Sequence, residues 1–320
     1  MNIDLNKNPT FADFSYGAIA LSTKKINKNE KGVILGEDAE YVHQMRVGLR
    51  KLRSVLIGFS PAMKLPKIVE EKKIGKIARI LGKKRDNDVL KENLIKYYYH
   101  FLNESEQKLC DQFIEHLDKQ NKDSHQNIIN TLKGKEYQKI KSSLKKWLKE
   151  PQFNLIAHQP IEEVANYLIM PQISKMLLQS GWFVGVERDD HQKIIIKEDY
   201  SLDEVKNLLK YHEESIHDLR KEAKKTRYQM ELLSKCYGKS YDDYLQLIVQ
   251  VQEILGNIQD NSVLINRIKN MFGKNWQKKM TNLDMLINTN QRQEWLNWQK
   301  IQRLFLVENT LKYDELLTLK

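Results

Sequence analysis

Cysteine is rare in this sequence. Only Cys110 and Cys236 occur among 320 residues, and neither has partners at the spacing of a metal site. Two distant thiols fit a reducing compartment, so we expect free cysteines and a cytoplasmic protein. With 41% hydrophobic residues, a chain of this length can bury a sizeable core. We therefore expect folding without a disulfide, a metal or a cofactor.

Proline and long apolar runs are scarce as well. None of the six prolines follows Pro171, and because proline interrupts helices, the C-terminal half permits long ones. No stretch of about 18 uninterrupted apolar residues occurs, as a membrane-spanning helix would require. The first ten residues carry Asp4 and Lys7 rather than the apolar core of a signal peptide. These features predict neither membrane spanning nor secretion.

What the chain does contain is hydrophobic periodicity typical of helices, which predicts an all-α protein built from helical bundles. The expected helices are 12–27, 40–59, 67–84, 88–102, 104–121, 135–149, 161–180, 202–236, 241–257, 262–271, 275–288 and 291–317. One segment differs. Two β-prone runs, Trp182–Val186 and Lys193–Lys197, flank a polar stretch, so we expect a small β-hairpin inserted near residues 182–197.

An internal repeat is the most informative feature of the sequence. A shift of 174 residues aligns His43, Arg46, Lys51 and Arg53 with His217, Arg220, Lys225 and Arg227, and Ile80–Gly82 with Ile254–Gly256. Thirteen of the 53 positions from His43 to Ile95 are identical without a gap. The repeat predicts two copies of one helical unit, in residues 1–150 and 151–320. Upstream the shift is 151, and the inserted hairpin accounts for the difference.

The repeated residues form cationic rows. Val42, Met45, Leu49 and Leu52 form a predicted apolar stripe on one side of a helix. The residue directly after each of them lies about 100° further round, which gives a row of His43, Arg46, Arg50 and Arg53 beside this stripe. The second copy has the row His217, Arg220, Lys224 and Arg227. A third row lies in the first copy only, at Lys72, Lys76, Arg79 and Lys83, and is followed by Arg85. Like charges at this spacing repel, so something must neutralise each row.

Two neutralisers are available. Asp86, Asp88 and Asp260, with nearby glutamates, can pair with some of the cations inside the protein. The alternative is a bound polyanion, whose oxygens suit rows of guanidinium and ammonium groups. From Lys64 to Arg85 nine basic residues face only two acidic ones, which favours the polyanion. The net charge of +11 also favours anionic partners but does not choose among nucleic acid, anionic lipid and polyphosphate.

Together these motifs carry a family resemblance. The spacing His43-x2-Arg46-x3-Arg50-x2-Arg53, its echo from His217 to Arg227, and the block Leu81–Leu90 with Arg85 and Asp86 resemble the CHAD domain, the conserved histidine α-helical domain. The resemblance implies two helical bundles related by a pseudo-twofold axis, and binding of inorganic polyphosphate by the basic rows. It also implies association with polyphosphate granules. Gln259 departs from the pattern, because it stands where the second copy would need a counterpart of Arg85.

Other functions are less well supported by the residues. Gly75–Lys84 lacks the spacing and the Ser/Thr of a phosphate-binding loop, and His212 and His217 lie one residue too far apart for a helical zinc motif. No Glu-x-Glu-x-Lys strand of a tunnel-type triphosphatase is present. We expect no catalysis and no metal site, with nucleic-acid binding as the second hypothesis, an enzyme acting on polyphosphate or nucleotides as the third, and a purely structural scaffold as the fourth.

Aromatic residues could stack on the bases of a nucleic acid, but they do not alternate with the cations in the rows. We expect Tyr97–Tyr99, Trp295 and Trp298 to pack in the core instead. For His43 and His217 we expect a contact with the ligand or a structural hydrogen bond rather than acid catalysis.

Overall fold

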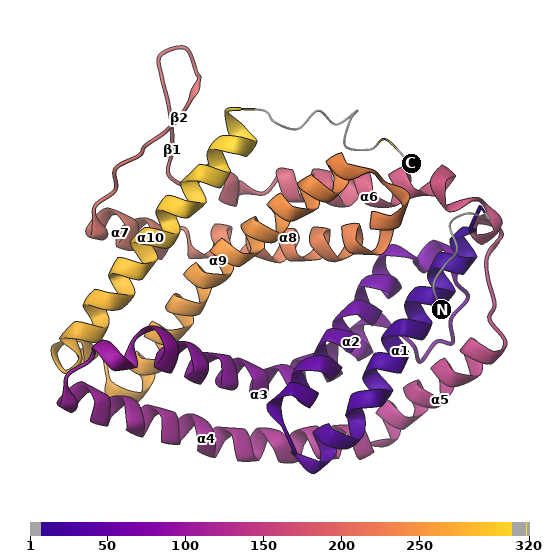
Figure 1. The fold of residues 1–320 in the computed structure, drawn as a ribbon, viewed down its shortest axis with the longest axis horizontal. Helices are drawn as coiled ribbons and strands as arrows, with labels where there is room; N and C mark the ends of the chain where they lie inside the picture. The colour runs from indigo at the N-terminus through magenta and orange to yellow at the C-terminus, as the bar shows by residue number, and fades with distance from the viewer. Residues whose placement is uncertain (1–7, 309–317, 319–320) are drawn as a thin grey trace. The chain divides into compact units, whose positions relative to one another are not determined.

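The computed structural model describes residues 8–308 and residue 318 of the chain, and it is all-α (Figure 1). About 81% of it is helical, with ten α-helices in the described part and one two-stranded sheet. The helices are α1 (Phe11–Leu35), α2 (Ala39–Gly58), α3 (Glu71–Tyr97), α4 (Glu104–Lys133), α5 (Lys135–Lys149), α6 (Ile161–Leu177), α7 (Leu202–Tyr211), α8 (Glu213–Leu233), α9 (Lys239–Phe272) and α10 (Thr281–Leu306). The predicted fold class is confirmed.

The described chain divides into two compact units. Unit one holds the chain up to Glu92 together with Ile114–Leu168, and unit two holds Asn93–Phe113 and the chain from Ile169. Both units therefore draw on α3, α4 and α6. The predicted boundary at residue 150 concerns the two copies of the sequence repeat rather than these units, and it stays a prediction.

In unit one, α1 and α2 pack closely. A capping box at Thr10 and Asp13 begins α1, and the Asp38 side chain caps α2. Where the two helices meet, a methyl group built on Gly48 would lie 2.9 Å from Ile26 and 3.3 Å from the carbonyl of Ser22. No larger residue fits this contact. The apolar stripe predicted for α2 is buried, with Val42, Met45, Leu49 and Leu52 at most 2% exposed.

In unit two, α8 is the helix that corresponds to α2 in the sequence repeat. Its predicted stripe is buried as well, at Ile216, Leu219, Ala223, Met230 and Leu233. The repeat places Glu222 where α2 has Gly48, and Glu222 is buried against α6. The second copy thus accepts a carboxylate at the position where the first copy has no side chain.

Several predicted helix breaks do not occur. The expected pairs 67–84 with 88–102, 241–257 with 262–271, and 275–288 with 291–317 each merge into one helix, α3, α9 and α10. The expected breaks fall at polar residues such as Asn87 and Asn261, whose side chains also favour turns. Here they are held by partners on other helices: Asn87 donates to Asn121 on α4, and Asn261 donates to Asn290 on α10. The expected helix 202–236 is instead two helices, α7 and α8, and the end of 291–317 lies outside the described residues.

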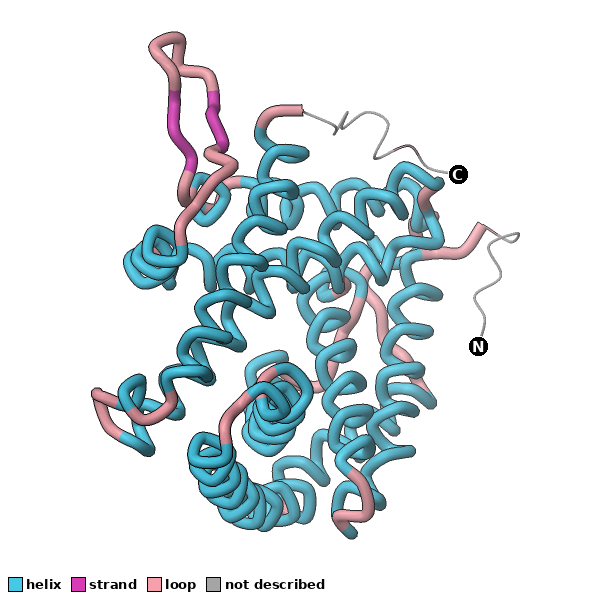
Figure 2. Tube along the Cα trace, turned by 60° about the vertical axis from the view of Figure 1, so that its left-hand side comes forward, coloured by secondary structure: helices cyan, strands magenta, loops and turns pink. Residues whose placement is uncertain are grey.

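The predicted hairpin is present in unit two. Strands β1 (Val186–Arg188) and β2 (Ile194–Ile196) pair antiparallel, with Val186 opposite Ile196, and Figure 2 shows them in magenta, projecting from the helices. Gln302 of α10 donates to the carbonyls of Trp182 and Val184, each at 2.9 Å. The base of the hairpin is therefore fixed to a helix, whereas its tip lies in the solvent.

No described helix combines the length and the apolar character that crossing a lipid bilayer requires.

Candidate functional site

The basic row of α2 faces α3 within unit one. A methyl group built on Gly82 would lie 3.5 Å from Cζ, Nε and Nη2 of Arg46 alike, so the face of the guanidinium group covers this glycine. Arg46 Nη1 also donates to Asp86 Oδ1 at 3.0 Å. The Arg46 and Asp86 side chains are 32% and 63% exposed. Both the arginine and its acidic partner are therefore open to solvent.

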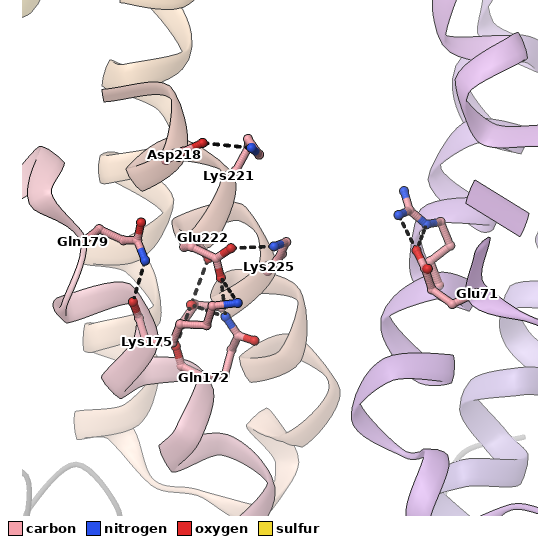
Figure 3. A network of polar contacts seen from close by, with 10 residues as sticks. Glu71, Gln172, Lys175, Gln179, Asp218, Lys221, Glu222 and Lys225 are labelled. Atoms are coloured by element: carbon pink, nitrogen blue, oxygen red, sulfur yellow. Dashed lines mark hydrogen bonds and ion pairs between the residues drawn. The ribbon is translucent and has the colours of Figure 1, made fainter. Parts of the chain in front are cut away.

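One end of the same row repeats this arrangement. The Arg53 guanidinium lies against Gly75, with Cζ 3.2 Å from where a methyl group would stand. Arg53 Nε donates to Glu71 Oε1 at 2.8 Å, and Nη2 contacts the same oxygen; Figure 3 shows Glu71 accepting these bonds. Gly75 and Gly82 lie two helical turns apart on α3, and each thus makes room for one arginine of α2.

The lysine-rich row of α3 is exposed. Lys72, Arg79 and Lys83 form no ion pair with an acidic side chain in the described chain, and Arg79 Nε makes only a long bond of 3.4 Å to the carbonyl of Gly75. Lys76 has one acidic partner, Glu136 of α5, at 3.8 Å. Because Arg79 lies one turn from Gly75, this row borders the glycines that the α2 arginines cover. The structure brings the two predicted rows together on α2 and α3.

His43 lies among cations. Burial lowers its pKa below the ordinary value, Glu40 raises it in part, and the charges of Arg85 on α3, Arg50 on α2 and Lys25 on α1 lower it further. The imidazole is therefore held neutral at pH 7. Arg85 itself donates to Glu92 at 2.8 Å.

The second copy reproduces the central contact within unit two. A methyl group built on Gly256 would lie 3.6 Å from Nε and 3.8 Å from Nη2 of Arg220. Arg46 with Gly82 and Arg220 with Gly256 are related by the same shift of 174 residues. The Nε of Arg220 is buried and has no hydrogen-bond partner in the described part of the chain. This N–H group is therefore enclosed at the contact between α8 and α9.

Other parts of the second row differ from the first. His217 Nδ1 lies 3.2 Å from Oε1 of Gln259, the residue that replaces Arg85. Arg227 donates to Glu231 on its own helix at 2.8 Å and to Gln252 on α9 at 3.4 Å. The histidine keeps its neighbour on the next helix in both copies, but that neighbour is a cation near His43 and an amide near His217.

A buried carboxylate on α8 lies in the polar network of Figure 3. Glu222 pairs with Lys225 on α8 and with Lys175 on α6 at 3.6 Å, and accepts from Gln172 at 3.3 Å. Burial opposes ionisation, but the hydrogen bond from Lys225 and the charges of both lysines outweigh it, so the pKa of Glu222 is lowered. Glu222 therefore neutralises one cation of α8 and one of α6 that could otherwise contact a ligand.

Several sequence features are resolved by the structure. Gly75–Lys84 lies inside the continuous helix α3, so its backbone N–H groups serve the helix rather than a phosphate. Trp295, Trp298 and Tyr98 are buried as predicted. Tyr97 is 48% exposed, and the prediction of core packing is wrong for it. Sequence reasoning missed the glycines beneath the arginines, although Gly82 and Gly256 lie in an identical block of the repeat.

Comparison with known proteins assigns the family. The sequence profile of the CHAD domain matches residues 17–269, and the chain belongs to the CHAD domain family. It is similar in fold to the CHAD domain from the plant Ricinus communis, with 20% identity over 98% of this chain and 95% of that one and a TM-score of 0.60. It is also similar to PptA from Streptomyces chartreusis, with 12% identity over 94% and 98% of the two chains and a TM-score of 0.57. A search of curated protein sequences found no match.

Proposed function

We propose that this CHAD domain protein binds long-chain inorganic polyphosphate and does not catalyse a reaction on it. The observation that supports this most directly is the placement of Arg46 over Gly82, repeated as Arg220 over Gly256. Both copies hold a guanidinium group at a helix junction next to other cations. The proposed ligands are His43, Arg46, Arg50, Arg53, Lys72, Lys76, Arg79, Lys83, Arg85, His217, Arg220, Lys224 and Arg227.

The internal ion pairs do not compete strongly with such a ligand. Exposed ion pairs contribute about 0 to 1 kcal/mol each, and the pairs of Arg46 with Asp86 and Arg53 with Glu71 are open to solvent. A chain of phosphates can therefore replace these acids at little cost in free energy. Lys72, Arg79 and Lys83 have no acidic partner to lose among the described residues.

Polyphosphate fits the rows better than nucleic acid does. A single-stranded nucleic acid gains much of its affinity from bases that stack on aromatic side chains. All five tryptophans of the chain are buried, namely Trp147, Trp182, Trp276, Trp295 and Trp298. Charge-assisted bonds to phosphate oxygens need no such platform. Following the family resemblance, we propose that the protein associates with cytoplasmic polyphosphate granules.

Competition binding at physiological salt tests this function. Labelled long-chain polyphosphate is bound to the full chain and displaced by unlabelled polyphosphate, or by RNA or DNA of equal total charge. We expect polyphosphate to displace it best. We also expect affinity to fall steeply as salt rises and to grow with chain length, because the contacts are ionic and repeated.

Two outcomes would contradict the proposal. Tighter binding of RNA than of polyphosphate at equal charge would make the protein a nucleic-acid binder. Triphosphate or ATP binding as tightly as the long chain would replace the extended rows with a compact pocket.

A further inference from the structure

Helix α5 carries a basic surface that the three rows do not include. Its buried side consists of Tyr137, Ile140, Leu144 and Trp147, each at most 4% exposed. Three of these side chains line a small apolar pocket together with Ile26 of α1, Leu49 and Leu52 of α2, and Ile74 of α3. All of these residues belong to unit one. The packing therefore fixes which side of α5 turns away from the core.

The outward side of α5 is rich in lysines. Lys135, Lys139, Lys146 and Lys149 are exposed and recur at spacings of four, seven and three residues, which places them on one face of the helix. None of the four forms an ion pair with an acidic side chain in the part of the chain that the structure describes. The only acid on the helix is Glu136, and Glu150 follows as its C-cap residue. The face is left positively charged.

A neighbouring lysine shows the contrast. Lys141 lies on the flank of α5 and pairs with Glu30 of α1 at 2.6 Å, where Tyr137 also donates to Glu30 at 2.9 Å. A lysine that helps to hold α5 in place is thus matched by an acid. The outward lysines make no such structural contribution, so their charge is available to a ligand.

One ion pair connects this face to the lysine-rich row of α3. Lys76 lies 3.8 Å from Glu136 in the first turn of α5. Lys139 is three residues after Glu136, so the two side chains are neighbours on the helix surface. From Lys139 to Lys149 the helix rises by about 15 Å. The basic surface therefore runs from α3 onto α5 with a single acid at the junction.

We propose that the outward face of α5 is a second binding segment for the same polyphosphate chain, which continues from Lys76 along Lys139, Lys146 and Lys149. This inference rests on the proposed function, because it assumes that the chain occupies the α2 and α3 rows. It adds that a long chain gains contacts on α5 which a short chain cannot reach. The α5 lysines set the preference for long chains.

Neutral substitutions test this segment. The variant Lys139→Gln/Lys146→Gln is compared with Lys119→Gln/Lys122→Gln, which removes the same charge from α4 of the same unit. Dissociation constants for long-chain polyphosphate and for triphosphate are measured over a range of salt concentrations. Each phosphate neutralised on a single-stranded polyanion contributes about 0.7 to the slope of log affinity against log salt. We expect the α5 variant to lower this slope by about 1.4 for the long chain and to leave triphosphate binding unchanged.

The possible failures are distinguishable. If the unmodified protein does not bind polyphosphate, the proposed function falls and this inference falls with it. If the unmodified protein binds and the α5 variant matches it in affinity and slope, only the α5 segment is refuted. Equal losses in the α4 variant would also refute it, because the effect would then come from net charge. Circular dichroism of both variants checks that the helices are intact.

Discussion

At the scale of single residues, the site depends on what lies beneath its arginines. The guanidinium of Arg46 covers Gly82, and that of Arg220 covers Gly256. A methyl group at Gly82 would meet Arg46 at 3.5 Å, an ordinary contact, whereas a longer side chain would occupy the place of the guanidinium. The glycine is therefore a positioning residue for the arginine.

Substitutions at Gly82 separate helix stability from positioning. We expect Gly82→Ala to keep polyphosphate affinity and to raise the free energy of unfolding by about 0.5 to 1 kcal/mol, because glycine weakens helix interiors. We expect Gly82→Leu to weaken binding by displacing Arg46. Urea unfolding and binding curves measure the two effects. Unchanged affinity in a folded Gly82→Leu variant would show that the position of Arg46 over α3 does not matter for binding.

His43 predicts a pH dependence. Burial and the nearby cations lower its pKa in the free protein, and a bound polyanion raises it by favouring the imidazolium. Binding therefore takes up a proton, and affinity rises as pH falls through the pKa of the complex and levels off below the pKa of the free protein. Affinity measured from pH 8 to pH 5.5 checks this, with His43→Gln expected to flatten the curve and His191→Gln, at the hairpin tip, as the control. An unchanged curve in His43→Gln would leave this histidine a structural role only.

At the scale of elements, the two copies are unequal. Positions Lys72, Lys76, Arg79 and Lys83 of α3 correspond to Gln246, Gln250, Glu253 and Asn257 of α9, and all eight side chains are exposed. Four cations on one helix thus become three neutral residues and one acid on the other. In the second copy Glu222 also neutralises Lys175 and Lys225. The first copy presents the wider basic surface.

Charge reversal measures this inequality. We expect Arg46→Glu/Arg50→Glu/Arg53→Glu to reduce polyphosphate affinity more than Arg220→Glu/Lys224→Glu/Arg227→Glu, because the α2 row acts together with the α3 row. Binding curves at fixed salt, with helical content checked by circular dichroism, compare the two. Equal losses would mean that the α3 row does not contact the ligand, and a larger loss from the second triple would reverse the order of the copies.

The sequence predicted the helices and rows better than it predicted their junctions. A row such as His43 to Arg53 follows from helical periodicity alone, and its buried neighbours confirm it. The contact of Arg46 with Gly82 depends on which helix crosses α2, and local spacing carries no such information. The same holds for Asn87 and Asn261, whose side chains favour a break in the helix unless their partners on other helices are known.

At the scale of the whole molecule, the carboxylates near the basic rows are already engaged. Asp86 pairs with Arg46, Glu71 with Arg53 and Glu92 with Arg85. We expect no hydrolysis of polyphosphate or nucleoside triphosphates by the purified protein, with or without magnesium, because guanidinium and ammonium groups bind phosphates but supply neither a base nor a nucleophile. Phosphate release assays measure this. Turnover that survives repurification and is lost in Asp86→Asn or Asp260→Asn would make the protein an enzyme.

The hairpin offers a practical consequence. The first copy joins its paired helices α1 and α2 through residues 36–38, whereas the second copy places β1, β2 and α7 between α6 and α8. Bonds from Gln302 hold the base of the hairpin, and the turn residues Asp190–Gln192 are exposed. A fluorophore or a surface tether attached at Asp190 would therefore leave the buried core of unit two untouched. The tip of the hairpin is therefore a suitable attachment site for single-molecule measurements on this protein.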